Sequence, residues 1–362
     1  MSLKIFRQKA YIGIDLGGNS IKAVQIERTQ AGWKVEKAVR WPTPPSAIQD
    51  GVVTDVEALA EAIKAMVKEH KLSATNAIIG ASGGAVIVRT VSIPNMPEAV
   101  LRKSIKFEAS RYVPSSIEDS YIEFEILGQA DEDNMSVLIV ASPREIVESR
   151  VRACELAGIE VEIVDVEAFA AYRSIVESGF GDNYSDQTIA IVDIGAYSTN
   201  VSVVSSGAFA MTRSIPQAGA TLTEALKSYF KLSDEDAESG KAQLDLNMLL
   251  DVSKPSENPP LRVIQPFLDD QIREIRRSLN YYQSQQTDGN QSNPVARLVL
   301  CGGGSSLVGL DKYLEQKLGI ETVCTGVFEN PRFVYSGHED LGSGLDLAVA
   351  SGLAMRPFTK AA

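Results

Sequence analysis

Short blocks of apolar residues, each ended by glycine, proline or a polar turn, dominate the first part of the chain. The block Tyr11–Ile14 leads into Asp15-Leu16-Gly17-Gly18-Asn19-Ser20, and alternation resumes up to Ile26. This pattern predicts two strands joined by a glycine turn. Apolar positions three and four apart predict a helix from Asp55 to His70, capped by Thr54, and a short buried strand follows at 77–80.

The order of elements changes between residues 86 and 164. The patterns there predict strand 86–92, helix 97–110, strands 121–127 and 135–141, helix 143–157 and strand 160–164. This β-α-β-β-α-β order is typical of a small split βαβ module. We therefore predict that residues 86–164 form a module inserted into the first half of the chain.

The second half repeats the opening of the first. An apolar block at 189–192 leads into Asp193-Ile194-Gly195-Ala196-Tyr197-Ser198, so aspartate, glycine and serine recur at the same offsets as in the first phrase. One such phrase alone is as well explained by an ordinary hairpin turn. Two copies indicate related half-molecules that face a single anionic ligand.

The residue types in the two phrases suit a magnesium-bound phosphate. A carboxylate at the end of each strand, Asp15 and Asp193, can hold Mg²⁺ through its water shell. Backbone amides approach a phosphate closely at glycine turns. Lys22 either neutralises phosphate charge or is a surface lysine of the hairpin. The predicted phosphate ligands are Gly17, Gly18, Asn19 and Ser20 in the first phrase and Gly195, Ala196, Ser198 and Thr199 in the second.

A third glycine-rich element lies downstream, after the apolar block at 298–300. Gly302-Gly303-Gly304-Ser305 joins this predicted strand to a helix, so a flat ring or a sugar can lie against bare backbone, and the helix N-terminus favours a nearby phosphate. The phrase lacks the lysine of a Walker A loop and the spacing of a Rossmann fingerprint. By itself it is weak evidence of a site.

Composition narrows the function classes. The chain has 362 residues, 44% hydrophobic and 23% charged, which is long enough for two or more domains and typical of a soluble globular protein. The net charge of −12 argues against nonspecific nucleic-acid binding. Three scattered cysteines and two histidines offer no zinc site, and no window is apolar enough to cross a bilayer. We therefore expect a cytoplasmic protein.

The three motifs, in this order, resemble those of the actin, sugar-kinase and heat-shock ATPase superfamily. The resemblance implies an α/β, actin-like (ribonuclease H-like) two-lobed fold with an inserted FtsA-type small module. It implies hinge helices at 166–171 and 344–354 and an acidic-basic pair, Glu238 and Lys241, at the nucleoside. The implied domains are 8–85 with 165–187 and 340–362, the module 86–164, 188–215 with 294–339, and 216–293.

Within this superfamily, three stretches of the module (92–97, 107–114 and 137–144) are similar to the PilM family of type IV pilus assembly. FtsA ends in a membrane-binding amphipathic helix, whereas Pro357 near the end of this chain disfavours one, which favours PilM. The resemblance implies an adaptor that binds ATP or ADP with Mg²⁺ and holds the N-terminal cytoplasmic peptide of the inner-membrane protein PilN. It also implies recruitment to the cytoplasmic face of the inner membrane, contact with other pilus assembly proteins and a possible homo-oligomer.

The expected peptide groove lies between the first lobe and the module, with Val88–Ile93 and Leu101–Tyr112 as its first candidates. Hydrolysis needs a group that positions water, for which Glu167 is the candidate and Asp165 the second, although a carboxylate at a helix start is more often a cap. We expect at most a slow ATPase. Two alternatives stay open at this point, namely an FtsA-like filament-forming protein and a small-molecule (sugar) kinase.

Overall fold

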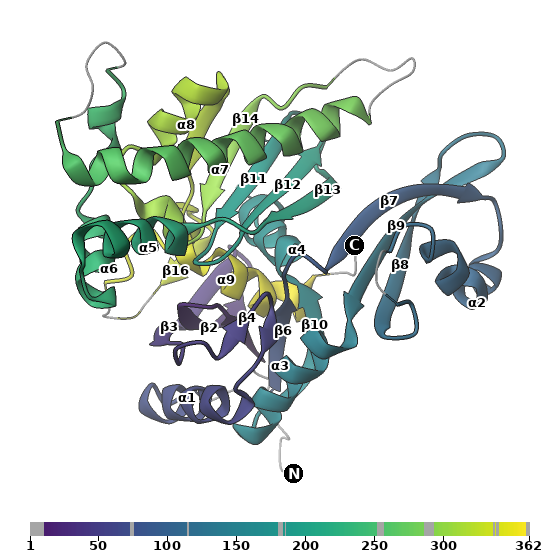
Figure 1. The fold of residues 1–362 in the computed structure, drawn as a ribbon. Helices are drawn as coiled ribbons and strands as arrows, with labels where there is room; N and C mark the ends of the chain where they lie inside the picture. The colour runs from purple at the N-terminus through teal and green to yellow at the C-terminus, as the bar shows by residue number, and fades with distance from the viewer. Residues whose placement is uncertain are drawn as a thin grey trace.

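Two sheets of similar topology form the cores of two lobes, as a computed structural model of the chain shows (Figure 1). The structure describes residues 11–72, 76–113, 116–179, 184, 186–251, 257–285, 293–335, 337 and 340–359. Residues 8–10 and 360–362 of the implied first lobe therefore lie outside the described residues.

The first-lobe sheet has the order β10-β6-β1-β2-β3-β16. β1, β2 and β3 form an antiparallel meander, and β6 and β10 continue the sheet in parallel from β1. The bounds of these strands are β1 Tyr11–Leu16, β2 Ser20–Arg28, β3 Trp33–Pro42, β6 Asn76–Ala81, β10 Glu160–Val166 and β16 Phe333–Tyr335. A separate short pair, β4 Ile48–Gln49 and β5 Val52–Val53, precedes α1 Val56–Glu69.

The second-lobe sheet, β13-β12-β11-β14-β15, repeats this plan. β11, β12 and β13 form an antiparallel meander, and β14 and β15 extend it in parallel from β11. Their bounds are β11 Thr188–Ile194, β12 Thr199–Ser205, β13 Ala208–Ile215, β14 Arg297–Cys301 and β15 Glu321–Cys324. The duplicated phrase therefore marks a duplicated half-sheet, and Asp15 and Asp193 lie at equivalent places on β1 and β11.

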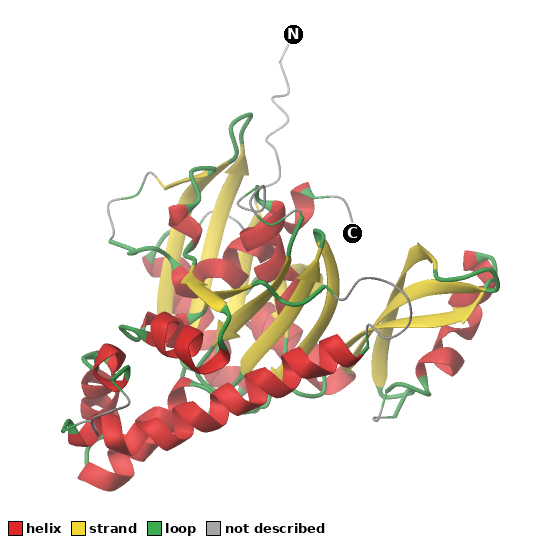
Figure 2. Ribbon diagram, turned by 90° about the horizontal axis from the view of Figure 1, so that it is seen from above, coloured by secondary structure: helices red, strands yellow, loops and turns green. Residues whose placement is uncertain are grey.

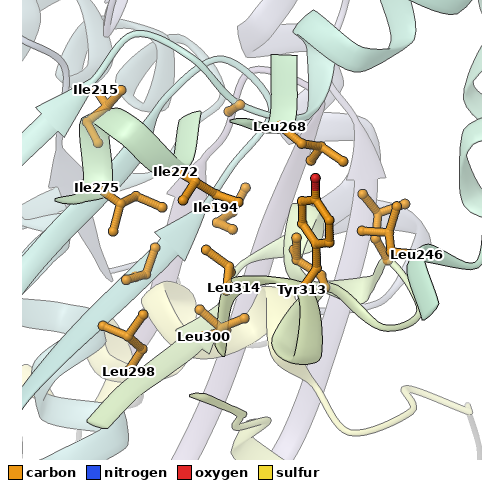
Figure 3. Packing of buried hydrophobic residues seen from close by; sticks show 14 of the residues in the cluster. Ile194, Ile215, Leu246, Leu268, Ile272, Ile275, Leu298, Leu300, Tyr313 and Leu314 are labelled. Carbon is orange, nitrogen blue, oxygen red and sulfur yellow. The ribbon is translucent and has the colours of Figure 1, made fainter. Parts of the chain in front are cut away.

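The second lobe is covered by amphipathic helices whose apolar faces enter one core. The helices are α5 Gly219–Phe230, α6 Asp234–Ala242, α7 Pro259–Ser284 and α8 Leu310–Leu318, with one-turn helices at Leu246–Leu249 (η3) and Gly303–Ser306 (η4). Leu268, Ile272 and Ile275 of α7 pack against Ile194, Leu298 and Leu300 of the sheet, together with Tyr313 and Leu314 of α8 (Figure 3).

Two short helices lie between the lobes. α4 Glu167–Tyr172 continues into the π-helical turn η1 Arg173–Glu177, and α9 Ala348–Met355 is followed by η7 Arg356–Phe358. Other one-turn helices are η5 Val327–Glu329 and η6 Leu345–Leu347. Apolar residues of α4 and α9 share a buried cluster, and a Cβ added to Gly352 would lie 2.9 Å from Cα of Ala170 and nearer still to its carbonyl group. Small residues therefore allow α4 and α9 to cross closely.

The module projects from one side of the molecule (Figure 2). Its sheet has the order β7-β9-β8 and packs on one helix around its own apolar cluster. The bounds are β7 Ile87–Pro94, α2 Glu98–Ala109, β8 Ser120–Gln129 and β9 Asn134–Pro143. The predicted two-lobed α/β arrangement with an inserted small module is thus confirmed.

Two of the six elements predicted for the module lie elsewhere. β10 pairs with β6 in the first-lobe sheet, and α3 Arg144–Leu156 places Ala153 and Cys154 in the first-lobe core beside Leu59 of α1. The element order was read correctly, but order alone does not say which sheet a strand joins. The helix cap also differs, because Asp55 rather than Thr54 accepts the Ala58 amide at the start of α1.

Candidate functional site

The two glycine hairpins face one another across the space between the lobes. A Cβ added to Gly18 in the β1–β2 turn would lie 2.5 Å from Cε2 of the Tyr197 ring in the β11–β12 turn and closer still to its Cδ2. The second turn is fixed from behind, since the amides of Gly219 and Ala220 at the start of α5 donate to the carbonyls of Gly195 and Ala196 at 3.2 and 2.8 Å. The sequence therefore brings the two predicted phosphate turns together.

In the first hairpin, Asp15 and Lys22 lie opposite each other across β1 and β2 and form a buried ion pair of 3.0 Å. Burial opposes the charge of Lys22, but the adjacent Asp15 carboxylate outweighs it and holds the pKa of Lys22 above its ordinary value. The turn itself is braced by Thr43, whose hydroxyl donates to the carbonyl of Gly17 at 2.6 Å. Lys22 is thus a buried, ion-paired side chain rather than a solvated surface lysine.

In the second hairpin, Asp193 occupies the position equivalent to Asp15. Burial raises the pKa of Asp193 to about 7, with further increases from the Asp15 and Glu167 carboxylates, while Lys22 and a hydrogen bond from Asn200 act in the opposite direction. Asn200 lies opposite Asp193 in the strand register, as Lys22 lies opposite Asp15. Sequence reasoning missed Asn200. An alignment of the two phrases shows it, because Asn200 follows Asp193 by seven residues, as Lys22 follows Asp15.

A divalent cation fits this concentration of negative charge. The Asp15 carboxylate raises the cost of ionising Glu167, and Asp15 and Glu167 both raise the cost of ionising Asp193, which a cation between Asp15 and Asp193 would relieve. Among the residues that the structure describes, no three His, Cys, Asp or Glu side chains are placed to hold a metal by themselves. The arrangement therefore suits Mg²⁺ that keeps waters and takes phosphate oxygens as further ligands.

Glu167 is the first residue of α4 and is held by Arg150 of α3, whose Nη1 lies 3.0 Å from Oε1. Burial raises the pKa of Glu167, although the guanidinium of Arg150 opposes that rise. The second catalytic candidate faces other groups, because Asp165 pairs with Arg173 at 2.9 Å and Arg356 at 3.7 Å. Of the two candidates, only Glu167 acts electrostatically on Asp193.

The third glycine element lies beside the second hairpin, since Cys301 pairs with Asp193 in the strand register. Gly302 has φ +84° and ψ 161°, and a Cβ there would lie 2.5 Å from the carbonyl oxygen of Ile194 and closer still to Oδ1 of Asp193. Gly304 is packed against Ile194 in the same way, whereas a Cβ on Gly303 would meet nothing closer than 3.9 Å. Gly303 is therefore the part of the turn with open backbone.

Two predicted phosphate or nucleoside ligands have hydroxyls that already donate within the protein. Thr199 is fully buried, and its hydroxyl donates to Gln217 and accepts from Gln271. Ser305 is also buried, and its hydroxyl donates to the carbonyl of Cys301. Their side chains support the two turns, which leaves the exposed Asn19 and the half-buried Ser20 and Ser198 nearer the open space.

The predicted acidic-basic pair lies on α6. Lys241 donates to Glu238 and Thr223 at 2.8 Å each and to the carbonyl of Gly219 at 3.3 Å. Gly219 in turn holds the Gly195 turn, so Lys241 links α6 to the second hairpin. Half of the Glu238 side chain stays exposed, at 51%, which leaves a carboxylate oxygen accessible to a ligand.

A different feature lies where the module meets the first lobe. Two adjoining hollows of about 470 and 500 Å³ open between β8 and α3. The first is mainly acidic and is lined by Asp119, Pro143, Arg144, Glu145, Glu148 and Ser149. The second is more apolar and is lined by Val56, Tyr121, Val147, Glu148, Ser149, Val151, Arg152 and Glu155. Tyr121 of β8 bridges to α3, with its hydroxyl 3.1 Å from Glu148.

These hollows have a different lining from the predicted groove candidates, Val88–Ile93 and Leu101–Tyr112. β7 is paired with β9 and lies beside β13 of the second lobe, while α2 covers the module's own core (Figure 1). β7 and β8 are both edge strands of this sheet, since each pairs with β9 alone among the described strands, but only β8 contributes a residue, Tyr121, to the lining of the hollows. The predicted location between first lobe and module still holds hollows, but they are lined by β8, α3 and α1.

The duplicated sheets, the facing hairpins and the inserted module together define the class of actin-like proteins. The chain belongs to a family within that class, type IV pilus assembly protein PilM, whose model matches residues 13–358. No helix among the described residues has the length and apolar character needed to span a membrane.

One solved structure agrees with this family, and curated relatives indicate the wider actin-like class. A PilM-PilN type IV pilus biogenesis complex is 26% identical, with a TM-score of 0.83 over 97% of this chain and 99% of that one. FtsA of Streptococcus pneumoniae is 21% identical over 87% of this chain and 75% of its own length, and FtsA of Pseudomonas aeruginosa is 22% identical over 91% and 87%. MreB5 of Spiroplasma citri bound to ADP is similar in fold alone, at 15% identity, 95% coverage of each chain and a TM-score of 0.54.

Proposed function

We propose that this protein is a nucleotide-binding adaptor of type IV pilus assembly. It binds Mg²⁺-ATP or Mg²⁺-ADP between the hairpins, and it holds the N-terminal cytoplasmic peptide of PilN between the first lobe and the module. The protein would act at the cytoplasmic face of the inner membrane, where it links PilN to other assembly proteins. The facing of the two hairpins is the observation that carries the nucleotide site.

In this proposal the nucleotide is held by residues of all three motifs. Backbone amides at Gly17–Ser20 and Gly195–Ser198 take phosphate oxygens, and Asp15 and Asp193 take the hydrated Mg²⁺, which supplies positive charge to the phosphates. Lys22 would offer its ammonium group to a phosphate oxygen. Gly303 and Glu238 would hold the nucleoside. Glu167 would orient the attacking water. Because its carboxylate is held by Arg150, we expect at most slow hydrolysis.

The partner site is supported by the two adjoining hollows, one mainly acidic and one more apolar, beside the edge strand β8. An extended peptide can add to β8 through backbone hydrogen bonds and place alternate side chains in the two hollows. The similar PilM-PilN complex supports PilN as the partner.

Separate variants test the two sites. Asp193→Ala removes a metal-side carboxylate, so we expect weaker Mg²⁺-ATP binding with unchanged affinity for a synthetic peptide of the PilN N-terminus. Tyr121→Ala removes a wall of the hollows and should do the reverse, while Tyr229→Ala, an exposed tyrosine of α5, is the matched control. Unchanged ATP affinity in the first variant, or unchanged peptide affinity in the second, would contradict the corresponding site.

A further inference from the structure

One buried arginine reaches from the helix that lines the hollows to the candidate nucleotide site. Arg150 of α3 is only 1% exposed and is among the largest fully buried side chains of the described residues. It donates to the carbonyls of Gly51 and Gly80 at 2.9 and 2.6 Å, to the hydroxyl of Ser82 at 3.1 Å, and to Glu167 at 3.0 Å. Arg150 therefore ties α3 to β6, to the loop before β5 and to the start of α4.

The surroundings of this arginine are too closely packed to absorb a displacement. A Cβ on Gly80 would lie 3.3 Å from Oε1 of Glu167 and nearer still to its Cγ, so the Glu167 side chain is confined between Gly80 and Arg150. A Cβ on Gly83 would lie 2.6 Å from the carbonyl oxygen of Asp50, so the turns at 50–51 and 82–83 are also in close contact. Closely packed interiors transmit displacement rather than damp it.

The opposite face of the same helix forms the wall of the hollows. Val147, Glu148, Ser149, Val151 and Arg152 line them, while Arg150 points inward between these residues. Ser149 also accepts the amide of Val53 on β5 at 3.1 Å. A ligand bound in the hollows therefore contacts a helix whose buried residue Arg150 is hydrogen-bonded to Glu167.

Glu167 carries the connection into the nucleotide site. Its charge acts on Asp193 and is itself influenced by Asp15, so the position of its partner guanidinium changes the field at both metal-side carboxylates. The path consists of packed and hydrogen-bonded groups from α3 through Arg150 to Glu167, and an electrostatic interaction carries it from Glu167 to Asp193.

We infer that Arg150 is a positioning residue that couples the two sites, so that a partner segment in the α3–β8 hollows and Mg²⁺-nucleotide at the hairpins alter each other's affinity through the Arg150–Glu167 contact. This inference rests on the proposed function of both sites. The coupling is reciprocal, because a change in peptide affinity caused by nucleotide must equal the change in nucleotide affinity caused by peptide.

The test is a binding cycle on the full chain. The affinity of a fluorescent PilN N-terminal peptide is measured by anisotropy with and without saturating Mg²⁺-AMPPNP, and the ratio of the two dissociation constants is the readout. We expect a ratio of at least about fivefold in the unchanged protein. Arg150→Lys keeps the charge but not the four-way hydrogen bonding, and it should bring the ratio close to one.

Arg173→Lys is the matched control, because Arg173 is also a buried arginine, pairs with Asp165 and lies off this path. It should keep the ratio of the unchanged protein. If Arg150→Lys does not fold, the double variant Arg150→Met, Glu167→Met removes both charges together and should likewise abolish the ratio.

The inference is overturned if the folded Arg150 variant keeps the ratio of the unchanged protein. It is also overturned if Arg173→Lys brings the ratio as close to one as Arg150→Lys does. A ratio of one in the unchanged protein, with both ligands bound, overturns the inference but leaves the proposed function standing. Failure of either ligand to bind the unchanged protein overturns the proposed function and the inference with it.

Discussion

The replacement of Gly302 by alanine tests the geometry of the site most sharply, because two separate costs can be assigned to it. Its backbone, at φ +84° and ψ 161°, lies in a region that is essentially restricted to glycine, and a side chain there costs about 1–3 kcal/mol. The added Cβ would also lie 2.5 Å from Ile194 O and against Asp193, and overpacking of this kind costs about 1–3 kcal/mol more. We expect Gly302→Ala to lower the free energy of unfolding by about 2–6 kcal/mol.

Gly319→Ala is the matched control for the backbone term. Gly319 has φ +73° at the end of α8, and a Cβ there would have no neighbour within 4 Å, so its expected cost is about 1–2 kcal/mol. Urea denaturation measures both variants. Calorimetry with Mg²⁺-ATP should show a loss of about tenfold in affinity for Gly302→Ala alone, because that Cβ displaces the Asp193 carboxylate. Equal stability and equal affinity of the two variants would refute the proposed packing of Gly302 on Asp193.

Two further predictions concern the lobe junction and the titration of Asp193. Gly352→Ala should lower the free energy of unfolding by about 1–3 kcal/mol because its Cβ would overlap Ala170, whereas Gly240→Ala, in an open position of α6, should raise it slightly. Thermal denaturation of both variants checks this prediction. A stabilised Gly352→Ala variant would contradict the close crossing of α4 and α9. The pKa of Asp193 is raised from 3.8 to about 7 in the folded protein, so without ligands the free energy of unfolding should fall as pH rises between these values. Asp193→Asn should flatten that dependence in urea titrations, and an unchanged slope would refute it.

The duplicated topology could be predicted because its signal is local. Each phrase has a buried strand, an aspartate and a glycine turn in sequence, and the two half-sheets repeat in the structure. The facing of the turns followed from the repeat of the phrase, and the contact between Gly18 and Tyr197 agrees with it. Asn200 was equally visible in the repeat, at the same offset as Lys22.

The parts that could not be predicted depend on tertiary packing. A sequence pattern gives β10 as a strand and α3 as a helix, but the sheet that each joins is decided by contacts far along the chain, such as those of β10 with β6. In the sequence, Arg150 is one of several charged residues of an amphipathic helix. Its burial depends on the hydrogen-bond acceptors that Gly51, Gly80 and Glu167 supply in the folded protein. The hollows share this origin, since β8 belongs to the module sheet and α3 packs on the first-lobe core.

The measurement that tests the central claim most directly is a calorimetric titration of the purified protein with Mg²⁺-ATP, with phosphate release followed in the same samples and with the PilN N-terminal peptide present or absent. The adaptor account predicts saturable binding of nucleotide and of peptide, with little phosphate released over the titration. Rapid turnover that does not depend on the peptide, or the absence of nucleotide binding, would contradict it.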